Sequence, residues 1–331
     1  MHSSAVDFAW LAAFENRLAP TTLAFLRNDS RFFLRDKDHP EFVDVVEKYQ
    51  FSKIHRLVLG ILPTSELEQE LDQTPSTVIN QTDAQGKTAL LWASRRGDET
   101  LVRLLLEHAA NPNISDRMRR SPLHMACRTK SVPAIKLLIK YGADTGANNF
   151  INEMPAHYAC YEEDSSRLLQ PLIEKGIDVN APSKFGRTLL DIVVQKDFSV
   201  ATRYLLDYGA IAAGAVMSGW QLKPLGRAVI YRAHRSAQVL LTMGCDEGFI
   251  DSQGHSILHI IAQYGNLETI HCLRSLRLGV EYADQKNKVG RSPFDVAKLH
   301  ADDERFLHAF EEMLEDIREA DYPENYVDAP T

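Results

Sequence analysis

Apolar positions along this chain fall into short helical groups, and one phrase of apolar and polar residues returns at a fixed interval. Ser121-Pro122-Leu123-His124-Met125-Ala126-Cys127 comes back as Met154-Pro155-Ala156-His157-Tyr158-Ala159-Cys160, with the two histidines 33 residues apart. Looser copies occupy residues 88–93 and 256–262. A fixed period of this length predicts a stack of similar small helical units rather than one globular core.

The residues around each copy resemble the ankyrin repeat. The pattern of that family is Asp-x-x-Gly-x-Thr-Pro-Leu-His-x-Ala-Ala, then a second helix that ends near Leu-Leu, then Gly-Ala-Asp-x-Asn. Asp83 and Gly86 precede one copy of the phrase, and Leu137-Leu138 is followed by Gly142-Ala143-Asp144. The resemblance implies an all-α ankyrin-repeat solenoid, in which helix–turn–helix repeats stack and short β-turn fingers join them.

Aligning the copies on the histidine position gives the register of the repeats. The residues at that position are Leu91, His124, His157, Asp191, Gly226, His259 and Asp295. We therefore expect about seven repeats over residues 83–317, with a divergent ankyrin-like repeat over 47–82 before them. The last repeat is expected to merge into an acidic capping helix. The agreement is weakest over 218–250, which lacks the turn Asp and Gly.

Residues 1–46 precede the repeats and have helical spacing in Phe8, Leu11, Phe14 and Leu18. An N-terminal helical cap that covers the exposed end of the stack is the simpler interpretation. The alternative is an F-box-like segment, which would make the chain a substrate-recognition adaptor of a ubiquitin ligase. Residues 17–34 match that motif poorly, so the cap is the preferred hypothesis.

The C-terminal part of the chain is acidic. Residues 301–331 contain eleven acidic and two basic residues, while the whole chain has a net charge of −8, so residues 1–300 are close to neutral. Apolar residues at helical spacing predict an amphipathic helix with an acidic outer face; they are Leu307, Phe310, Met313, Leu314 and Ile317. We expect residues 318–331 to be an acidic, disordered tail.

Composition and the ends of the chain bear on where the protein acts. No apolar run reaches the ~18 residues of a membrane span. The N-terminus lacks the basic start of a signal peptide and carries Asp7. Four cysteines, two of them at equivalent repeat positions, suit a reducing compartment. We expect a cytoplasmic or nuclear protein that makes no membrane contact.

Two pairs of residues, His124 with Cys127 and His157 with Cys160, have a spacing that suggests a zinc site. Neighbouring repeats lie roughly 10 Å apart, as packed helices do, so the two pairs are too far apart to share one ion comfortably. The sequence has no nucleophile elbow, phosphate-binding loop, dinucleotide fingerprint or zincin motif. We expect no metal, no cofactor, no small-molecule substrate and no enzymatic activity.

In ankyrin proteins, partners meet the finger turns and the exposed positions of the first helices, which line a concave face. The register places mainly basic and aromatic residues at those positions here, which are the types that dominate binding energy at interfaces. The candidate partner-binding residues are Lys87, Arg95, Arg96, Arg117, Met118, Arg119, Arg120, Arg128, Phe150, Ile151, Tyr161, Lys184, Phe185 and Arg187.

The expected function is that of a non-enzymatic scaffold or adaptor, which binds an acidic or amphipathic protein segment on the concave face. Nucleic acid is a poorer fit to the same basic residues, because the chain as a whole is acidic and has no recognisable nucleic-acid module. Exposed basic residues that only keep the stack in solution are the other alternative. The large apolar residues among the candidates argue against it.

Overall fold

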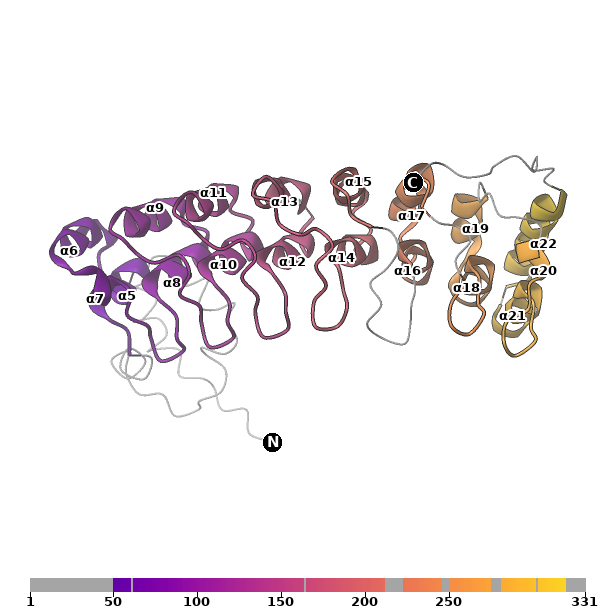
Figure 1. The fold of residues 1–331 in the computed structure, drawn as a ribbon, viewed down its shortest axis with the longest axis horizontal. Helices are drawn as coiled ribbons and strands as arrows, with labels where there is room; N and C mark the ends of the chain where they lie inside the picture. The colour runs from indigo at the N-terminus through magenta and orange to yellow at the C-terminus, as the bar shows by residue number, and fades with distance from the viewer. Residues whose placement is uncertain are drawn as a thin grey trace, which may run out of the picture. The chain divides into compact units, whose positions relative to one another are not determined.

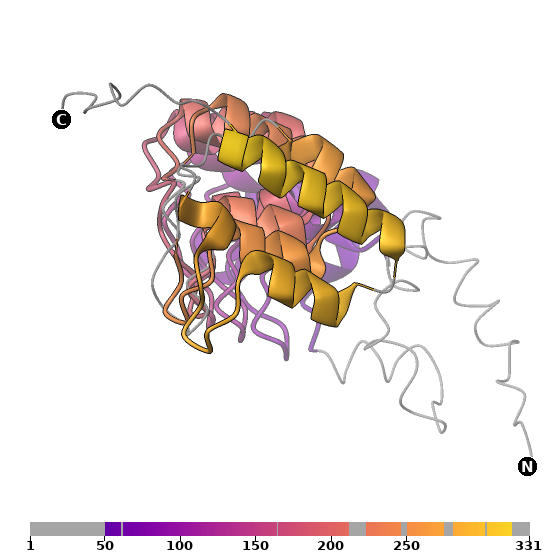
Figure 2. The same cartoon turned by 90° about the vertical axis from the view of Figure 1, so that its right-hand side faces the viewer.

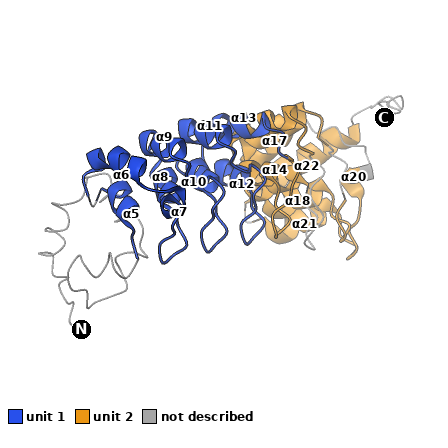
Figure 3. Cartoon of the chain, turned by 60° about the vertical axis from the view of Figure 1, so that its left-hand side comes forward, with its two compact units in different colours: residues 1–177 blue, residues 178–331 orange. Residues whose placement is uncertain are grey.

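The computed structural model describes residues 50–60, 62–163, 165–211, 223–245, 250–274, 281–301 and 303–319. The expected helical cap at 1–46 and the end of the expected tail, from residue 320 onward, lie outside the described residues. The chain divides into two compact units, unit 1 with residues 1–177 and unit 2 with residues 178–331 (Figure 3).

Unit 1 contains a short helical segment followed by three helix pairs. Its described elements are α5 (Lys53–Val58), η1 (Thr64–Glu66), α6 (Leu67–Gln73), α7 (Ser76–Ile79), α8 (Ala89–Arg96), α9 (Glu99–Glu107), α10 (Pro122–Arg128), α11 (Val132–Lys140), α12 (Pro155–Cys160) and α13 (Ser165–Ile173). The first helices of the pairs, α8, α10 and α12, pack side by side, and the second helices α9, α11 and α13 form the other layer (Figure 1). Helix α5 packs against α8 and so extends the row of first helices by one.

Unit 2 contains helix pairs of the same kind. Its described elements are α14 (Leu189–Gln195), α15 (Ser199–Asp207), α16 (Pro224–Ile230), α17 (His234–Thr242), α18 (Ile257–Tyr264), α19 (Leu267–Leu273), α20 (Glu281–Asp284), α21 (Pro293–His300) and α22 (Glu304–Glu319). Helix α22 packs against α19, α20 and α21 at the end of the unit (Figure 2). Its buried face includes Phe306 in place of the expected Leu307, which is half-buried.

The repeated phrase forms these helix pairs for local reasons. Thr88 caps α8, because its hydroxyl oxygen accepts the backbone N–H of Leu91 at 3.2 Å. Pro122 opens α10 at the first helical position, where a missing N–H costs nothing. Gly97 ends α8 in the left-handed conformation, at φ 69°. Ala126 is fully buried, and its small side chain lets neighbouring helices approach closely.

The core of each unit lies between its two layers of helices. Leu105 and Leu138 in unit 1, and Leu205 and Leu240 in unit 2, are fully buried on the second helices. Within the described ranges there is no regular β-sheet, and the β-structure consists of isolated bridges at the bases of two fingers, such as Thr82 with Thr88. The predicted all-α stack of helix–turn–helix units with short fingers is confirmed.

Candidate protein-interaction surface

Each complete finger of unit 1 is a short turn that the side chain of its first residue holds in place. In the finger 116–120, Asp116 Oδ1 accepts the backbone N–H groups of Met118 and Arg120, both at 2.9 Å. Arg120 also donates from Nε to Asp116 Oδ2 at 2.9 Å, so its half-buried side chain braces the turn. Asn149 makes the same pair of backbone contacts in the next finger. The turn is therefore rigid, and its middle residues point outward.

The fourth residue of a finger adopts the left-handed conformation. Arg119 does so with a φ of 59°, which costs an L-residue roughly 1–2 kcal/mol. Its side chain is exposed. In four other fingers this position is glycine, with φ between 72° and 80°, namely Gly86, Gly186, Gly254 and Gly290.

Adjacent fingers of unit 1 are joined through their backbones. The N–H of Phe150 donates to the carbonyl oxygen of Met118, and the N–H of Arg117 donates to that of Gln85, each at 3.3 Å. The ladder brings the exposed side chains of Met118 and Phe150, at 51% and 55% accessibility, onto neighbouring fingers. Arg117 and Arg119 are exposed beside them. These four residues form one exposed patch, and their part in binding a partner stays a prediction.

A buried histidine connects the base of one finger to the preceding repeat. His124 Nε2 donates to the carbonyl oxygen of Glu153 at 3.0 Å, while Nδ1 accepts the backbone N–H of Ser121 at 3.1 Å. Burial lowers the pKa of His124 to about 4. The imidazole is therefore neutral at pH 7, as its two contacts require. It fixes the finger 149–153 relative to α10.

Two predicted surface residues are not on the surface. Lys87 and Arg95 are only 2% and 5% exposed. Both pack on the fully buried Trp92: Lys87 Nζ lies 4.1 Å and the Arg95 guanidinium carbon 5.5 Å from its ring centroid. The assignment of these two residues to the partner-facing surface is wrong, because the indole ring gives their cations a buried place to stack.

The other candidates in unit 1 are partly engaged within the unit. Arg96 donates from Nη1 to the carbonyl oxygen of Val58 at 2.6 Å and so helps to hold α8 on α5. The Tyr161 hydroxyl donates to Glu153 Oε1 at 3.1 Å. Ile151 is half-buried, whereas Arg128 is exposed. Glu153, an acidic exception at a finger position that is basic in most other repeats, was not among the candidate binding residues.

The remaining three candidates belong to unit 2. Lys184 and Phe185 are exposed at the tip of the finger 183–187, Phe185 at 62%. Arg187 donates from Nη2 to Gln195 Oε1 at 2.7 Å and is half-buried. That these residues share one face with those of unit 1 stays a prediction.

The described residues include neither a reactive cysteine nor a metal-binding cluster. Cys127 and Cys160 are fully buried, and burial raises the pKa of both thiols, so neither is a nucleophile. Over the described ranges, no three His, Cys, Asp or Glu side chains are grouped as a metal site would need. None of the described helices combines the length and apolar character that crossing a bilayer requires.

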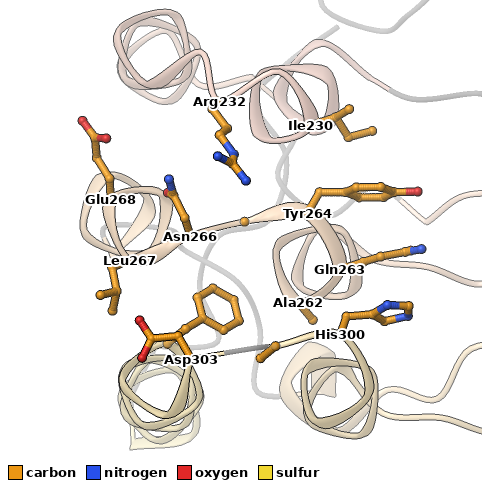
Figure 4. Close-up of a pocket in the computed structure, with 13 residues that line it drawn as sticks. Ile230, Arg232, Ala262, Gln263, Tyr264, Asn266, Leu267, Glu268, His300 and Asp303 are labelled. Carbon is orange, nitrogen blue, oxygen red and sulfur yellow. The ribbon is translucent and has the colours of Figure 1, made fainter.

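Unit 2 has a pocket of about 670 Å³ that no sequence motif marks (Figure 4). It lies where the turns of three successive helix pairs approach one another. Arg232 and Asn266 face it from one side, and Asp303 lies on another (Figure 4). The wall at Gly265 needs glycine, since a Cβ there would lie 2.5 Å from the carbonyl oxygen of Ile261. Basic and acidic groups both line the pocket, so its charge favours neither an anionic nor a cationic ligand.

Known proteins provide an independent view of this fold. The family model for ankyrin repeats, in three copies, matches residues 61–149. The ankyrin repeat domain of Bcl-3 superimposes with a TM-score of 0.59 at 26% identity, over 69% of this chain and 99% of that domain. This chain contains ankyrin repeats over residues 61–149 and has the ankyrin-repeat fold. The human ASB11 ankyrin repeat domain also has this fold, with a TM-score of 0.58 at 22% identity, over 69% of this chain and 98% of that one.

Relatives in sequence share only part of this ankyrin-repeat chain. Ankyrin repeat family A protein 2 of Mus musculus is 38% identical over 63 residues, which are 19% of this chain and 18% of that protein. Neurogenic locus notch homolog protein 1 of Xenopus laevis is 32% identical over 141 residues, 40% of this chain and 6% of that protein. The chain therefore spans less than a fifth of these relatives, and the likeness covers the repeats. Ankyrin repeats are generally protein-interaction modules without catalytic activity.

Proposed function

We propose that this chain is a non-enzymatic scaffold or adaptor that binds an acidic or amphipathic segment of a protein partner. The binding surface is the finger patch of unit 1, which we define as Arg117, Met118, Arg119 and Phe150, with Arg128 beside it on α10. Lys184 and Phe185 on the first finger of unit 2 are further candidate anchors. The described residues include no catalytic constellation that would favour an enzyme.

The observation that carries the proposal is Arg119 itself. Four other fingers use glycine at the left-handed position, whereas this one keeps an exposed arginine at a conformational cost. The adjacent finger has Asn152 at this position, a residue type that tolerates the left-handed conformation better than arginine does. A side chain retained in a strained backbone conformation points to function. Arg119 belongs to the same patch as Met118 and Phe150. These two apolar side chains are exposed to solvent, as is typical of an interaction site.

The composition of the finger patch indicates its partner. Its two arginines, together with Arg128 on α10, attract negative charge and steer encounter. Met118 and Phe150 supply apolar area, and the burial of such side chains holds a complex together. A segment with acidic and apolar residues complements both features. The acidic chain as a whole, at −8, repels nucleic acid and leaves a protein as the better partner.

Quantitative affinity purification with the intact chain tests the proposal. Arg117→Glu/Arg119→Glu reverses two charges and spares Arg120, which braces the turn. Arg203→Glu/Arg235→Glu, two exposed arginines on the second helices of unit 2, is the matched control. Partners of the intact chain should be depleted about tenfold by the finger variant and retained by the control.

Kinetics on the recovered partner then separate the two parts of the patch. The arginine variant should slow association and flatten its dependence on salt, since rim charges steer encounter. Phe150→Ala should shorten the lifetime of the complex, because it removes buried aromatic area. If both variants leave affinity within about a factor of two, the finger patch is not the binding surface.

A further inference from the structure

A recess of about 490 Å³ lies on the second helices of unit 1, away from the finger turns. Residues of α9 and α11 form most of it, and Arg167 of α13 completes it. Its apolar part is Val132, Pro133 and Leu137 of α11. The recess was not anticipated from the repeat pattern, because exposed positions of second helices vary freely between repeats.

The charged side chains that line this recess are mainly positive. Arg103, Lys136, Lys140 and Arg167 line it, and all four are exposed. The single acidic residue of the lining, Glu99, is already paired with Arg103, with 2.5 Å between Oε1 and Nη2. Lys136 and Arg167 have no ion-pair partner among the described residues. Three uncompensated positive charges therefore surround one small recess in a chain whose net charge is −8.

Unit 2 provides an internal comparison. Its second helices α17 and α19 also leave a recess, of about 610 Å³. The arginine of that lining, Arg274, is paired with Asp316 at 3.1 Å. Recesses between second helices thus follow from the packing of the stack. What distinguishes the recess of unit 1 is its cluster of four cations.

We propose that the recess on α9 and α11 binds the phosphate of a phosphoserine or phosphothreonine in a peptide segment. A phosphate monoester concentrates about two negative charges and three acceptor oxygens in one group, which matches several converging cations better than a single carboxylate does. Clusters of arginines are a recurrent means of recognising phosphorylated segments. Because no finger residue takes part, the inference adds a second binding surface to the proposed function.

The shape of the recess favours a peptide over an anionic membrane. A hollow admits a protruding side chain, whereas a bilayer surface makes contact with protruding basic residues. The apolar side chains of Val132, Pro133 and Leu137 lie next to the cations and can contact the residues that flank a phosphorylated position.

The test uses immobilised degenerate peptide pools with a fixed central phosphoserine or phosphothreonine, and the same pools without phosphate. The full chain should be retained at least about tenfold better by the phosphorylated pools. Arg103→Gln/Arg167→Gln should abolish the difference, while Arg203→Gln/Arg235→Gln should keep it. Arg203 occupies in α15 the position that Arg103 occupies in α9, and all four residues are exposed, so circular dichroism should show folded variants.

Four results would overturn the inference. Equal retention by the phosphorylated and plain pools, or retention that the Arg103→Gln/Arg167→Gln variant leaves unchanged, would remove the recess as a phosphate site. Displacement by sodium chloride as effective as by inorganic phosphate at equal ionic strength would mean general electrostatic attraction. Binding to phosphatidylcholine–phosphatidylserine vesicles, lost in the variant and without retention by the pools, would assign the cations to a membrane surface. Failure of the finger-patch experiment would leave all these readouts unaffected.

Discussion

Units 1 and 2 are built from the same helix pairs, and they differ in one of the contacts that join successive repeats. In unit 1, neutral histidines reach the next finger: His55 Nε2 meets the Lys87 carbonyl oxygen at 2.9 Å and His124 meets that of Glu153. In unit 2, His259 Nε2 makes the same contact with the Arg291 carbonyl oxygen at 3.1 Å, but Asp191 stands at the histidine position of the first repeat. Its Oδ1 lies 3.1 Å from Arg227 Nε without the alignment of a hydrogen bond.

The second helices of the two units also differ in which residues they bury. The buried positions of α9 include Leu101 and Val102, whereas those of α15 include Ala201 and Thr202. Ser236 of α17 is likewise a buried polar residue in unit 2. The burial of an apolar side chain stabilises the fold and needs no polar partner. A buried charge or hydroxyl stabilises the fold only while its hydrogen-bond or ion-pair partners are present. Unit 1 also buries polar side chains, such as Ser94 and Ser165, so the comparison shows that one repeat pattern tolerates different buried contacts in different repeats.

The largest expected effect comes from opening a cavity in either unit. Leu138→Ala in α11 and Leu240→Ala in α17 each remove a fully buried side chain and should cost about 2–5 kcal/mol of unfolding free energy. In a stack, each repeat is stabilised by its neighbours, so the loss of amide protection in hydrogen exchange should concentrate in the mutated unit. Equal loss of protection across both units would contradict separate cooperative units.

Lowering the pH should weaken the histidine contacts of unit 1 and so destabilise the fold. The pKa of His124 is about 4 in the folded chain and about 6.5 when unfolded, so the unfolded chain binds more protons between these values. The contribution of His124 is complete above pH 6.5 and declines as pH falls toward 4, on the order of 2–4 kcal/mol in total. Burial also lowers the pKa of His55.

Hydrogen exchange at pH 7 and pH 5 measures this acid response in α10 and α14. Protection of α10 should fall more, because α14 carries Asp191 where α10 carries His124. His124→Gln, which cannot titrate, should reduce the pH dependence of α10. An unchanged pH dependence in that variant would show that other groups cause the acid response.

A smaller effect should distinguish the polar second helices of unit 2. Thr202 Oγ1 lies 3.3 Å from Ser236 Oγ, and both are fully buried. Thr202→Val should cost about 1–2 kcal/mol, since Ser236 loses a partner, and adding Ser236→Ala should recover most of that loss. Chemical denaturation of the two variants provides the values. An additive loss in the double variant would mean that the hydroxyl pair is not coupled.

The smallest expected effect on stability is at Arg119. Arg119→Gly relieves the left-handed strain and adds freedom to the unfolded chain, so unfolding free energy should change by less than about 1 kcal/mol. Partner binding should nevertheless weaken, because the exposed guanidinium is lost. A strong loss of stability would show that Arg119 supports the fold and would remove the main reason for assigning it to binding.

The sequence predicted what depends on spacing and missed what depends on packing. The period, the caps such as Thr88 and the finger turn at Asp116 follow from residue types at fixed offsets, and the structure has them. The burial of Lys87 and Arg95 could not be foreseen, because both depend on Trp92, which fills the core beneath them. The basic recess was also missed, since it combines side chains from three helices that are far apart in sequence.

Site-specific photo-crosslinking tests the central claim, that the finger patch of unit 1 binds the partner, most directly. A benzophenone-bearing residue is placed at Phe150, and in a matched chain at Val289, a residue on the last finger of unit 2 with 75% accessibility. We expect a strong crosslink to a protein partner from position 150, diminished by Arg117→Glu/Arg119→Glu, and little crosslinking from position 289. A crosslink from position 289 alone, or equal crosslinks from both positions, would contradict it.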